Sequence, residues 1–199
     1  MNSLSTLKTG DWHNPPPQWQ LSEDALTLET GSETDFWSET LYGFRRDDGH
    51  ALLVPVSGDF TAHLTFDGAY ETLYDQAGVM LRQDETHWLK AGIEFSDAVP
   101  NMSVVVTRGA SDWSTLALPS ASGPQRLRLT RIGNAVVVQF RNAANRWQLL
   151  RVADFSVGTE LLVGPMACSP KRSGFRAVFT EFAIGPAVTQ ALHDESSTS

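Results

Sequence analysis

The chain has 199 residues, of which 41% are hydrophobic and 19% are charged, a balance typical of a globular protein that buries a core without a metal or a disulfide. Its net charge of −8 and its pI near 5.0 argue against a nucleic-acid partner and against an anionic membrane surface, because phosphates attract basic patches. No apolar run approaches the ~20 residues of a membrane-spanning helix, and the single cysteine, Cys168, excludes an intrachain disulfide.

The N-terminal segment is expected to be held loosely. Residues 1–11 contain little to pack, and they lack the basic stretch followed by an apolar stretch that marks a secretory signal. Trp12, the prolines at 15–17 and Trp19 predict an extended segment that lies against the domain. Together with the lone cysteine, this N-terminus predicts a reducing, cytoplasmic location.

Strand-like runs then follow one another, with turn residues about every 8–12 positions. No long window has the 3.6-residue period of a helix. Residues 111–114 are expected to form a turn that presents Trp113. The expected strands lie at 25–30, 50–56, 60–66, 74–82, 88–95, 102–107, 125–130, 135–142, 147–152, 160–164, where Gly164 and Pro165 make a break, and 175–184.

This succession of strands predicts one all-β domain over residues 12–186. A single antiparallel two-sheet sandwich of the jelly-roll type fits best, because so large a sheet protein must protect its edge strands. The sequence has neither an internal repeat nor an interdomain linker. The tail at 187–199 ends in the polar run HDESSTS and is expected to be disordered.

The central pair of strands, at 74–82 and 88–95, has two chemically different faces. Side chains alternate along a strand, so one face of this pair is continuously apolar and suits a core. The other face carries polar groups, and it is expected to be open to a polar ligand, because antiparallel sheets can leave one face wet. The alternative is a Lys90–Glu94 ion pair on a solvated face. The predicted ligand-binding residues are Gln76, Lys90 and Glu94, joined by Trp88, Trp113 and Arg128.

Glycoside hydrolysis would require a second carboxylate near Glu94. Retaining enzymes place two carboxyls about 5–5.5 Å apart across the scissile bond. Gly92 and Ser96 are two positions away from Glu94 on the same face, so the strand itself supplies no partner, and no catalytic residue is predicted. A partner from elsewhere in the sandwich stays open, from Asp75, Asp112 or Glu181.

No cofactor is predicted. The five histidines are scattered without the spacing of paired metal ligands. A structural calcium ion is an alternative, with Asp47, Asp48 or Asp67 as ligands, although no loop has the ligand density of a calcium motif. Cys168 lies in an apolar context and is expected to be a buried packing thiol.

Five segments within residues 12–185 resemble those of a known family, and they occur in the same order. They are DFWSETLYGF, GDFTAHLTFDGAYETLYDQAGVML, HWLKAGIE, SVVVTRGASDWS and GPMACSPKRSGFRAVFTEF. Together they are similar to a microbial and fungal family of domains of unknown function that is named after a yeast "regulation of enolase" protein. The resemblance implies the concanavalin A-like lectin/glucanase jelly roll, whose two curved sheets create a concave face.

Three functions are compatible with this resemblance, because a fold does not decide a function. Relatives by fold include legume-type lectins, glucanases and the accessory domain of some xylosidases, so the first hypothesis is that the concave face binds a small carbohydrate or sugar derivative. The second is a regulatory protein-interaction module of metabolism, in which exposed aromatics such as Trp37 and Tyr42 meet a partner. The third is a sugar-processing enzyme with a second carboxylate near Glu94.

Overall fold

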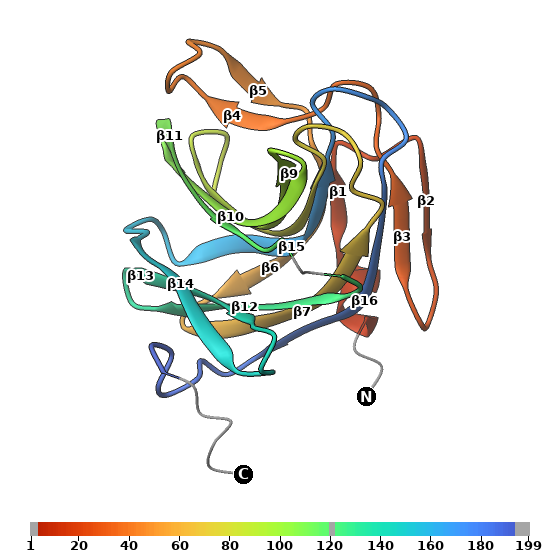
Figure 1. The fold of residues 1–199 in the computed structure, drawn as a ribbon. Coiled ribbons are helices and arrows are strands. Elements are labelled where there is room, and N and C mark those ends of the chain that lie inside the picture. The colour runs from red at the N-terminus through yellow and green to blue at the C-terminus, as the bar shows by residue number, and fades with distance from the viewer. Residues whose placement is uncertain (1–3, 120–121, 194–199) are drawn as a thin grey trace.

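The computed structural model describes residues 4–119 and 122–193, and it consists mainly of two seven-stranded antiparallel sheets packed on each other (Figure 1). This architecture confirms the predicted two-sheet sandwich. The first sheet has the order β1 (Asp11–His13), β6 (His50–Ser57), β15 (Glu160–Cys168), β8 (Gln76–Arg82), β9 (His87–Ser96), β10 (Val99–Arg108) and β11 (Ala110–Ala117). The second has the order β14 (Trp147–Asp154), β13 (Ala135–Arg141), β12 (Gln125–Ile132), β7 (Phe60–Gly68), β16 (Arg176–Gly185), β3 (Leu26–Glu29) and β2 (Gln18–Leu21).

The longer strands lie close to where the alternation of side chains predicts them, while one prediction for a short segment is wrong. Residues 111–114 belong to strand β11, where Trp113 pairs with Val105 of β10. Trp12 and Trp19 lie in short strands at the two sheet edges, and their rings contact each other at 5.3 Å between centroids. Polar and exposed side chains obscure the period of two in such edge strands.

Both chain ends are more ordered than expected within the described ranges. Residues 5–9 form the short 3-10 helix η1 (Ser5–Thr9), because Leu4 and Leu7 bury their side chains in the main core. Residues 187–193 lie against the second sheet, where Val188 donates to Thr61 and Ala191 is buried. The end of the expected disordered tail, 194–199, lies outside the described residues. In the described ranges no helix is long and apolar enough to cross a membrane.

The main core lies between the two sheets. In each central strand, alternate apolar residues point inward, as the period of two requires. Phe66, Leu129 and Phe182 from the second sheet are buried in the same cluster as Val79 and Ala91 from the first. This packing accounts for the apolar face of the central strand pair and leaves its polar face on the outside of the sandwich.

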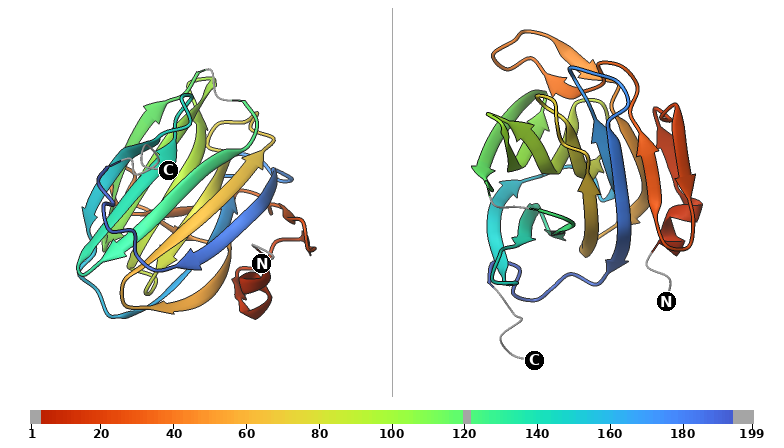
Figure 2. Two further views of the ribbon diagram at one scale, coloured as in Figure 1. Left: turned by 90° about the horizontal axis from the view of Figure 1, so that it is seen from below. Right: turned by 45° about the vertical axis from the view of Figure 1, so that its right-hand side comes forward.

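A small hairpin covers part of that outer face. It consists of β4 (Phe36–Ser38) and β5 (Arg45–Asp47), and the first sheet curves around it (Figure 1 and Figure 2). A second apolar cluster fills the space between them, so the wet face predicted for the central strands is wrong over this half of the sheet. Its members are Phe36, Trp37, Ala51, Leu53, Met80, Trp88, Val105, Met166 and Cys168.

The register of β8 and β9 brings the predicted polar residues together. Gln76 lies opposite Glu94, and one step along the same face Gly78 lies opposite Gly92. A side chain at Gly78 would meet the carbonyl oxygen of Ala91 at 2.0 Å, so no other residue fits there without a backbone shift. The paired glycines therefore add no side chain of their own to the space beside Gln76 and Glu94.

Candidate functional site

A pocket of about 320 Å³ opens on the concave face of the first sheet, beside the β4–β5 hairpin. The hairpin, strands β8 to β11 and two loops contribute to its lining. The lining residues are Asp35, Trp37, Tyr42, Phe44, Leu73, Tyr74, Gln76, Lys90, Glu94, Val105, Trp113, Pro170 and Lys171.

Four of the six residues predicted to bind a ligand line this pocket: Gln76, Lys90, Glu94 and Trp113. The other two do not. Trp88 is fully buried in the apolar cluster under the hairpin. Arg128 lies in β12 of the second sheet, where its guanidinium stacks on Trp147 at 4.6 Å and donates to Gln139 at 2.6 Å. The prediction placed Arg128 on the wrong sheet because alternation within a strand does not reveal which strands are neighbours.

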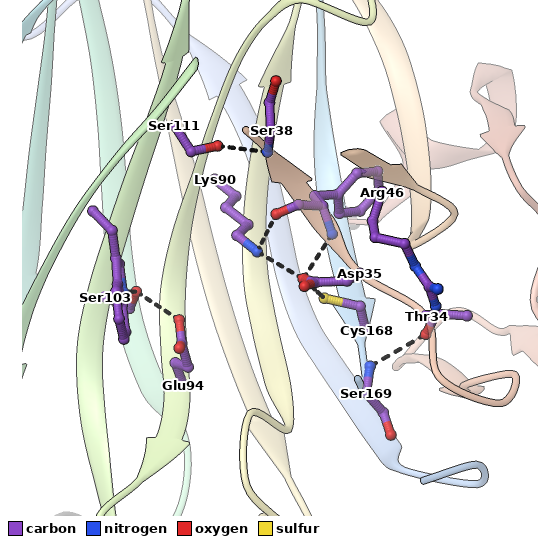
Figure 3. A network of polar contacts seen from close by, with 12 residues as sticks. Thr34, Asp35, Ser38, Arg46, Lys90, Glu94, Ser103, Ser111, Cys168 and Ser169 are labelled. Atoms are coloured by element: carbon purple, nitrogen blue, oxygen red, sulfur yellow. Dashed lines mark hydrogen bonds and ion pairs between the residues drawn. The ribbon is translucent and has the colours of Figure 1, made fainter. Parts of the chain in front are cut away.

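Lys90 is 3% exposed and holds the hairpin to the sheet (Figure 3). Its Nζ donates to the carbonyl oxygen of Phe36 at 2.7 Å and lies 3.2 Å from Oδ1 of Asp35. Burial alone would lower the pKa of Lys90, but nearby acidic groups, with Asp35 foremost, hold the pKa above its ordinary value. Lys90 is therefore a charged partner of Asp35, and the alternative of a Lys90–Glu94 pair on a solvated face is wrong.

Glu94 is the second buried carboxylate of the pocket, at 5% exposure. Its Oε2 accepts a hydrogen bond from Ser103 at 2.9 Å, and Ser103 in turn accepts one from Nε1 of Trp113 at 3.0 Å. Burial raises the pKa of Glu94 above its ordinary value, although Lys90 and Ser103 act in the opposite direction. A carboxylate has about four lone-pair sites, so Glu94 keeps capacity to accept hydrogen bonds from a ligand.

Gln76 contributes an unpaired amide to the pocket. Its residue is 4% exposed, and its side-chain amide forms no hydrogen bond with any residue in the described ranges. The amide atoms are not among the buried polar atoms that lack a partner, so they stay accessible at the pocket wall. An amide offers two donor hydrogens and an acceptor oxygen, so Gln76 can bond a polar ligand that replaces water there.

Four aromatic side chains surround these polar groups. The ring of Trp37 meets Trp113 edge to face, with centroids 6.2 Å apart and planes at 88°. On one side of this pair Tyr42 contacts Trp37 at 5.8 Å, and on the other Tyr74 contacts Trp113 at 6.4 Å. Tyr42 is 50% and Trp113 38% exposed, so ring surface remains available to a ligand.

Strained backbone adjoins the same pocket. Tyr74 has a φ of 69°, and Glu39 and Leu41, which flank the turn that carries Tyr42, have φ values of 60° and 66°. Residues with side chains rarely adopt this left-handed conformation, and the strain that it costs is often found near functional sites. The left-handed residues are thus Tyr74 itself and two that closely precede Tyr42, both pocket aromatics.

The sequence identified the strand residues of the pocket and missed those of the hairpin. Asp35, the partner of Lys90, is not among the predicted residues. Tyr42 is expected only to meet a protein partner, and Trp37 either to meet a partner or to join the polar face from a loop. Strands β4 and β5 contain three residues each, which is too short for alternation to be visible. The motif DFWSE, with an acid directly before two aromatic residues, is the available signal.

The carboxylates proposed from sequence as partners for Glu94 are engaged elsewhere. Asp75 is fully buried and binds Arg172, with Oδ2 2.5 Å from Nη2. Asp112 points away from Trp113 and pairs with Arg151 at 3.0 Å. Glu181 lies in β16 of the second sheet. Asp35 is the acidic group that shares the pocket with Glu94, and its carboxylate already forms an ion pair with Lys90.

The described part of the chain contains no group of three His, Cys, Asp or Glu side chains placed to hold a metal ion. Of the aspartates considered for calcium, Asp47 binds the guanidinium of Arg82 with both oxygens, at 2.7 and 2.8 Å. Cys168 is fully buried, as expected, and burial raises the pKa of its thiol far above the ordinary value. A thiol that stays protonated in this way is a packing group and a poor nucleophile.

Solved structures of known proteins share this fold. A crystal structure described as a functionally unknown protein from Saccharomyces cerevisiae is 43% identical, with a TM-score of 0.88, and the match covers 92% of this chain and all of that one. A xylan β-1,4-xylosidase from Bacillus halodurans has a TM-score of 0.65 at 15% identity, over 90% of this chain and 38% of that chain. A legume lectin-like domain from Entamoeba histolytica has a TM-score of 0.59 at 11% identity, over 92% of both chains. The last two likenesses show the jelly-roll fold alone.

Sequence comparison extends this to a family. A protein of Saccharomyces cerevisiae called "Regulation of enolase protein 1" is 44% identical over 190 residues, which cover 96% of this chain and 96% of that protein. The family model described as "Protein of unknown function (DUF1349)" matches residues 12–187, the whole sandwich with its central pair of strands and the pocket hairpin. The chain therefore belongs to the DUF1349 family of proteins of unknown function, to which the five sequence segments pointed.

Proposed function

We propose that the pocket binds a small sugar or sugar derivative. The observation that carries the proposal is the side-chain amide of Gln76, which lines the pocket, forms no hydrogen bond with the described chain and keeps its polar atoms accessible to a ligand. Beside it, Glu94 has further capacity to accept hydrogen bonds. A sugar hydroxyl both donates and accepts, so neighbouring hydroxyls on one ring match an amide next to a carboxylate.

The aromatic groups and the size of the pocket support the same ligand class. Sugar rings have C–H faces that pack on aromatic side chains, and Trp113 and Tyr42 keep exposed ring surface at the pocket. A volume of about 320 Å³ lies at the lower end of the range for small-molecule sites. Lectin-like and xylosidase structures share the fold, which is an analogy that favours carbohydrate without identifying it.

Replacing Gln76 with leucine tests the proposal by isothermal titration against a panel of monosaccharides and short oligosaccharides. We expect at least one sugar to bind the wild-type chain, and the variant to bind it about tenfold or more weakly, because two hydrogen bonds of ~1 kcal/mol each are lost. Gln20→Ala is the matched control, since Gln20 is an exposed strand glutamine of the second sheet. The proposal is refuted if no sugar of the panel gives heat of binding with the wild-type chain and if Gln76→Leu leaves the stability of the protein unchanged.

A second candidate is a regulatory interaction with a metabolic enzyme. The turn at residues 39–44 between β4 and β5 exposes Leu41 to 86%, and Tyr42 stacks on Phe44 beside it at 5.6 Å. An exposed apolar group of this kind is typical of a contact surface for another protein. The name of the yeast relative, "Regulation of enolase protein 1", suggests enolase as the partner to test.

Mixing the chain with purified enolase in analytical size-exclusion chromatography tests this candidate. We expect co-elution in a fixed ratio, and Leu41→Ser is expected to weaken the complex about tenfold, because a largely buried leucine contributes ~1.5–3 kcal/mol. Leu192→Ser is the control, since Leu192 is an exposed leucine that lies at the second sheet. Leu41 does not line the pocket, so its loss should leave sugar binding unchanged. Separate elution at micromolar concentrations would reject the candidate.

A further inference from the structure

We propose that the pocket recognises a protonated amino group on its ligand, so that the sugar derivative it takes is an amino sugar. The inference rests on the proposed function, because it takes the ligand to be a sugar derivative in this same pocket. Three features carry it: the mutual orientation of the aromatic rings, the balance of charges, and the hydrogen-bonding groups left for the rest of the ligand.

The aromatic rings form steep walls rather than one flat platform. Trp37 and Trp113 are nearly perpendicular, at 88°, and Tyr74 meets Trp113 at 77°. Tyr42 meets Trp37 at 64° and adds a further wall. A single exposed ring can still pack on the C–H face of a sugar, and several rings at steep angles to one another also suit a compact cation, which is attracted by ring faces.

The charges of the pocket leave one carboxylate without a cation in contact with it. Asp35 and Lys90 form an ion pair, since Nζ and Oδ1 are 3.2 Å apart and both side chains are largely buried. Glu94 binds the neutral hydroxyl of Ser103, and Lys90 attracts it only at longer range, without an ion pair to Glu94 among the described residues. Lys171, the other basic group that lines the pocket, is exposed, so water screens its charge.

A ligand ammonium next to Glu94 would complete this arrangement. It would replace water as the partner of a buried carboxylate, and its remaining N–H and C–H groups would face the aromatic rings. Burial raises the pKa of Glu94, which is the sign of an anion that lacks sufficient stabilisation in the free protein. The amide of Gln76 stays available for the ligand's sugar hydroxyls.

Isothermal titration of the full chain at pH 7 with three matched sets of ligands tests the inference. Each set contains an amino sugar, its N-acetyl derivative and the parent hexose, in the gluco, galacto and manno series. In at least one series we expect the amino sugar to bind about tenfold tighter than both neutral compounds. If the neutral compounds bind as tightly as the amino sugar, the inference fails and the proposed function stands. If no compound binds, both fail.

Two variants locate the effect. Glu94→Gln keeps the shape of the side chain and its contact with Ser103, and it should reduce the preference for the amino sugar to about twofold or less while the neutral sugars change little. Glu181→Gln is the matched control, because Glu181 is a strand glutamate that accepts a hydroxyl hydrogen bond, from Thr65 at 2.7 Å, on the other sheet. An unchanged preference in Glu94→Gln would overturn the inference.

Tyr42→Leu provides a second variant that does not depend on a buried charge. Tyr42 is half exposed, so its replacement should leave the thermal unfolding temperature nearly unchanged. The loss of one aromatic wall should weaken the amino sugar about threefold to tenfold and the neutral sugars by less. Equal loss for charged and neutral ligands would show that the ring serves only as a platform, which contradicts the inference.

Discussion

Asp35→Ala is expected to lower the free energy of unfolding by about 3–5 kcal/mol, as measured by urea denaturation, because it leaves a buried charge without its partner. Lys90 is 3% exposed, and besides Asp35 its ammonium has only the carbonyl oxygen of Phe36 as a hydrogen-bond acceptor among the described residues. The loss should also loosen the β4–β5 hairpin, since Asp35 directly precedes β4 and Lys90 lies in β9. Weakened ligand binding should accompany it.

A double variant and an exposed ion pair supply the controls. In Asp35→Ala with Lys90→Met no charge is left stranded, so most of the lost stability should return, as is observed when buried ion pairs are replaced by apolar groups. Glu39→Ala breaks the Arg45–Glu39 pair of the same hairpin, whose side chains are 60% and 46% exposed, and should cost less than about 1 kcal/mol. Equal losses for Asp35→Ala and Glu39→Ala would contradict the role given to the Asp35–Lys90 pair.

Asp75→Ala is expected to cost about 3 kcal/mol or more, because several hydrogen bonds to one buried carboxylate disappear together. The carboxylate of Asp75 is fully buried and accepts hydrogen bonds from Nη2 and Nε of Arg172, at 2.5 and 3.0 Å. It also accepts hydrogen bonds from the backbone N–H groups of Glu71 and Thr72, at 3.1 and 2.9 Å. Asp75 therefore ties together the two loops that carry Tyr74 and Lys171 to the pocket.

Ligand binding distinguishes this anchoring role from a purely local effect. Asp75→Ala should weaken binding of any pocket ligand as well as stability, since the loops at 73–74 and 170–171 lose their common support. Asp112→Ala serves as the control, because it removes a strand aspartate paired with Arg151 whose side chain is 65% exposed. It should change stability by less than about 1 kcal/mol and leave binding intact. Loss of stability without any loss of affinity would show that the loops hold their positions without Asp75.

The hairpin explains why a jelly roll of this kind offers a small pocket instead of an open groove. It covers the half of the concave face around Trp88 with an apolar cluster, while the half around Glu94 stays accessible. The Asp35–Lys90 pair lies at the border between the two halves (Figure 3). The same hairpin presents Leu41 outward and Tyr42 toward the pocket, so it takes part in both candidate functions.

Much of the fold was accessible from the sequence alone. Alternation of apolar and polar residues located the long central strands, because each buries one face in the main core and a period of two is the direct consequence. The same alternation placed Gln76, Lys90 and Glu94 on one face, and the five segment motifs indicated the family. These are properties of residues near each other in the chain, so they can be read before the chain folds.

Only the tertiary structure decided which residues share the pocket. Sheet order assigned Arg128 to the opposite sheet, and the β4–β5 hairpin buried Trp88 and brought Asp35 to Lys90, 55 positions away. Leu4 and Leu7 likewise become core residues only because the sandwich offers them a place. Strand neighbours and hairpin docking depend on long-range packing, and no local period encodes them. The sequence therefore identified the polar face of the central strands correctly. The tertiary structure was needed to show that the hairpin covers half of this face and that aromatic rings surround the rest.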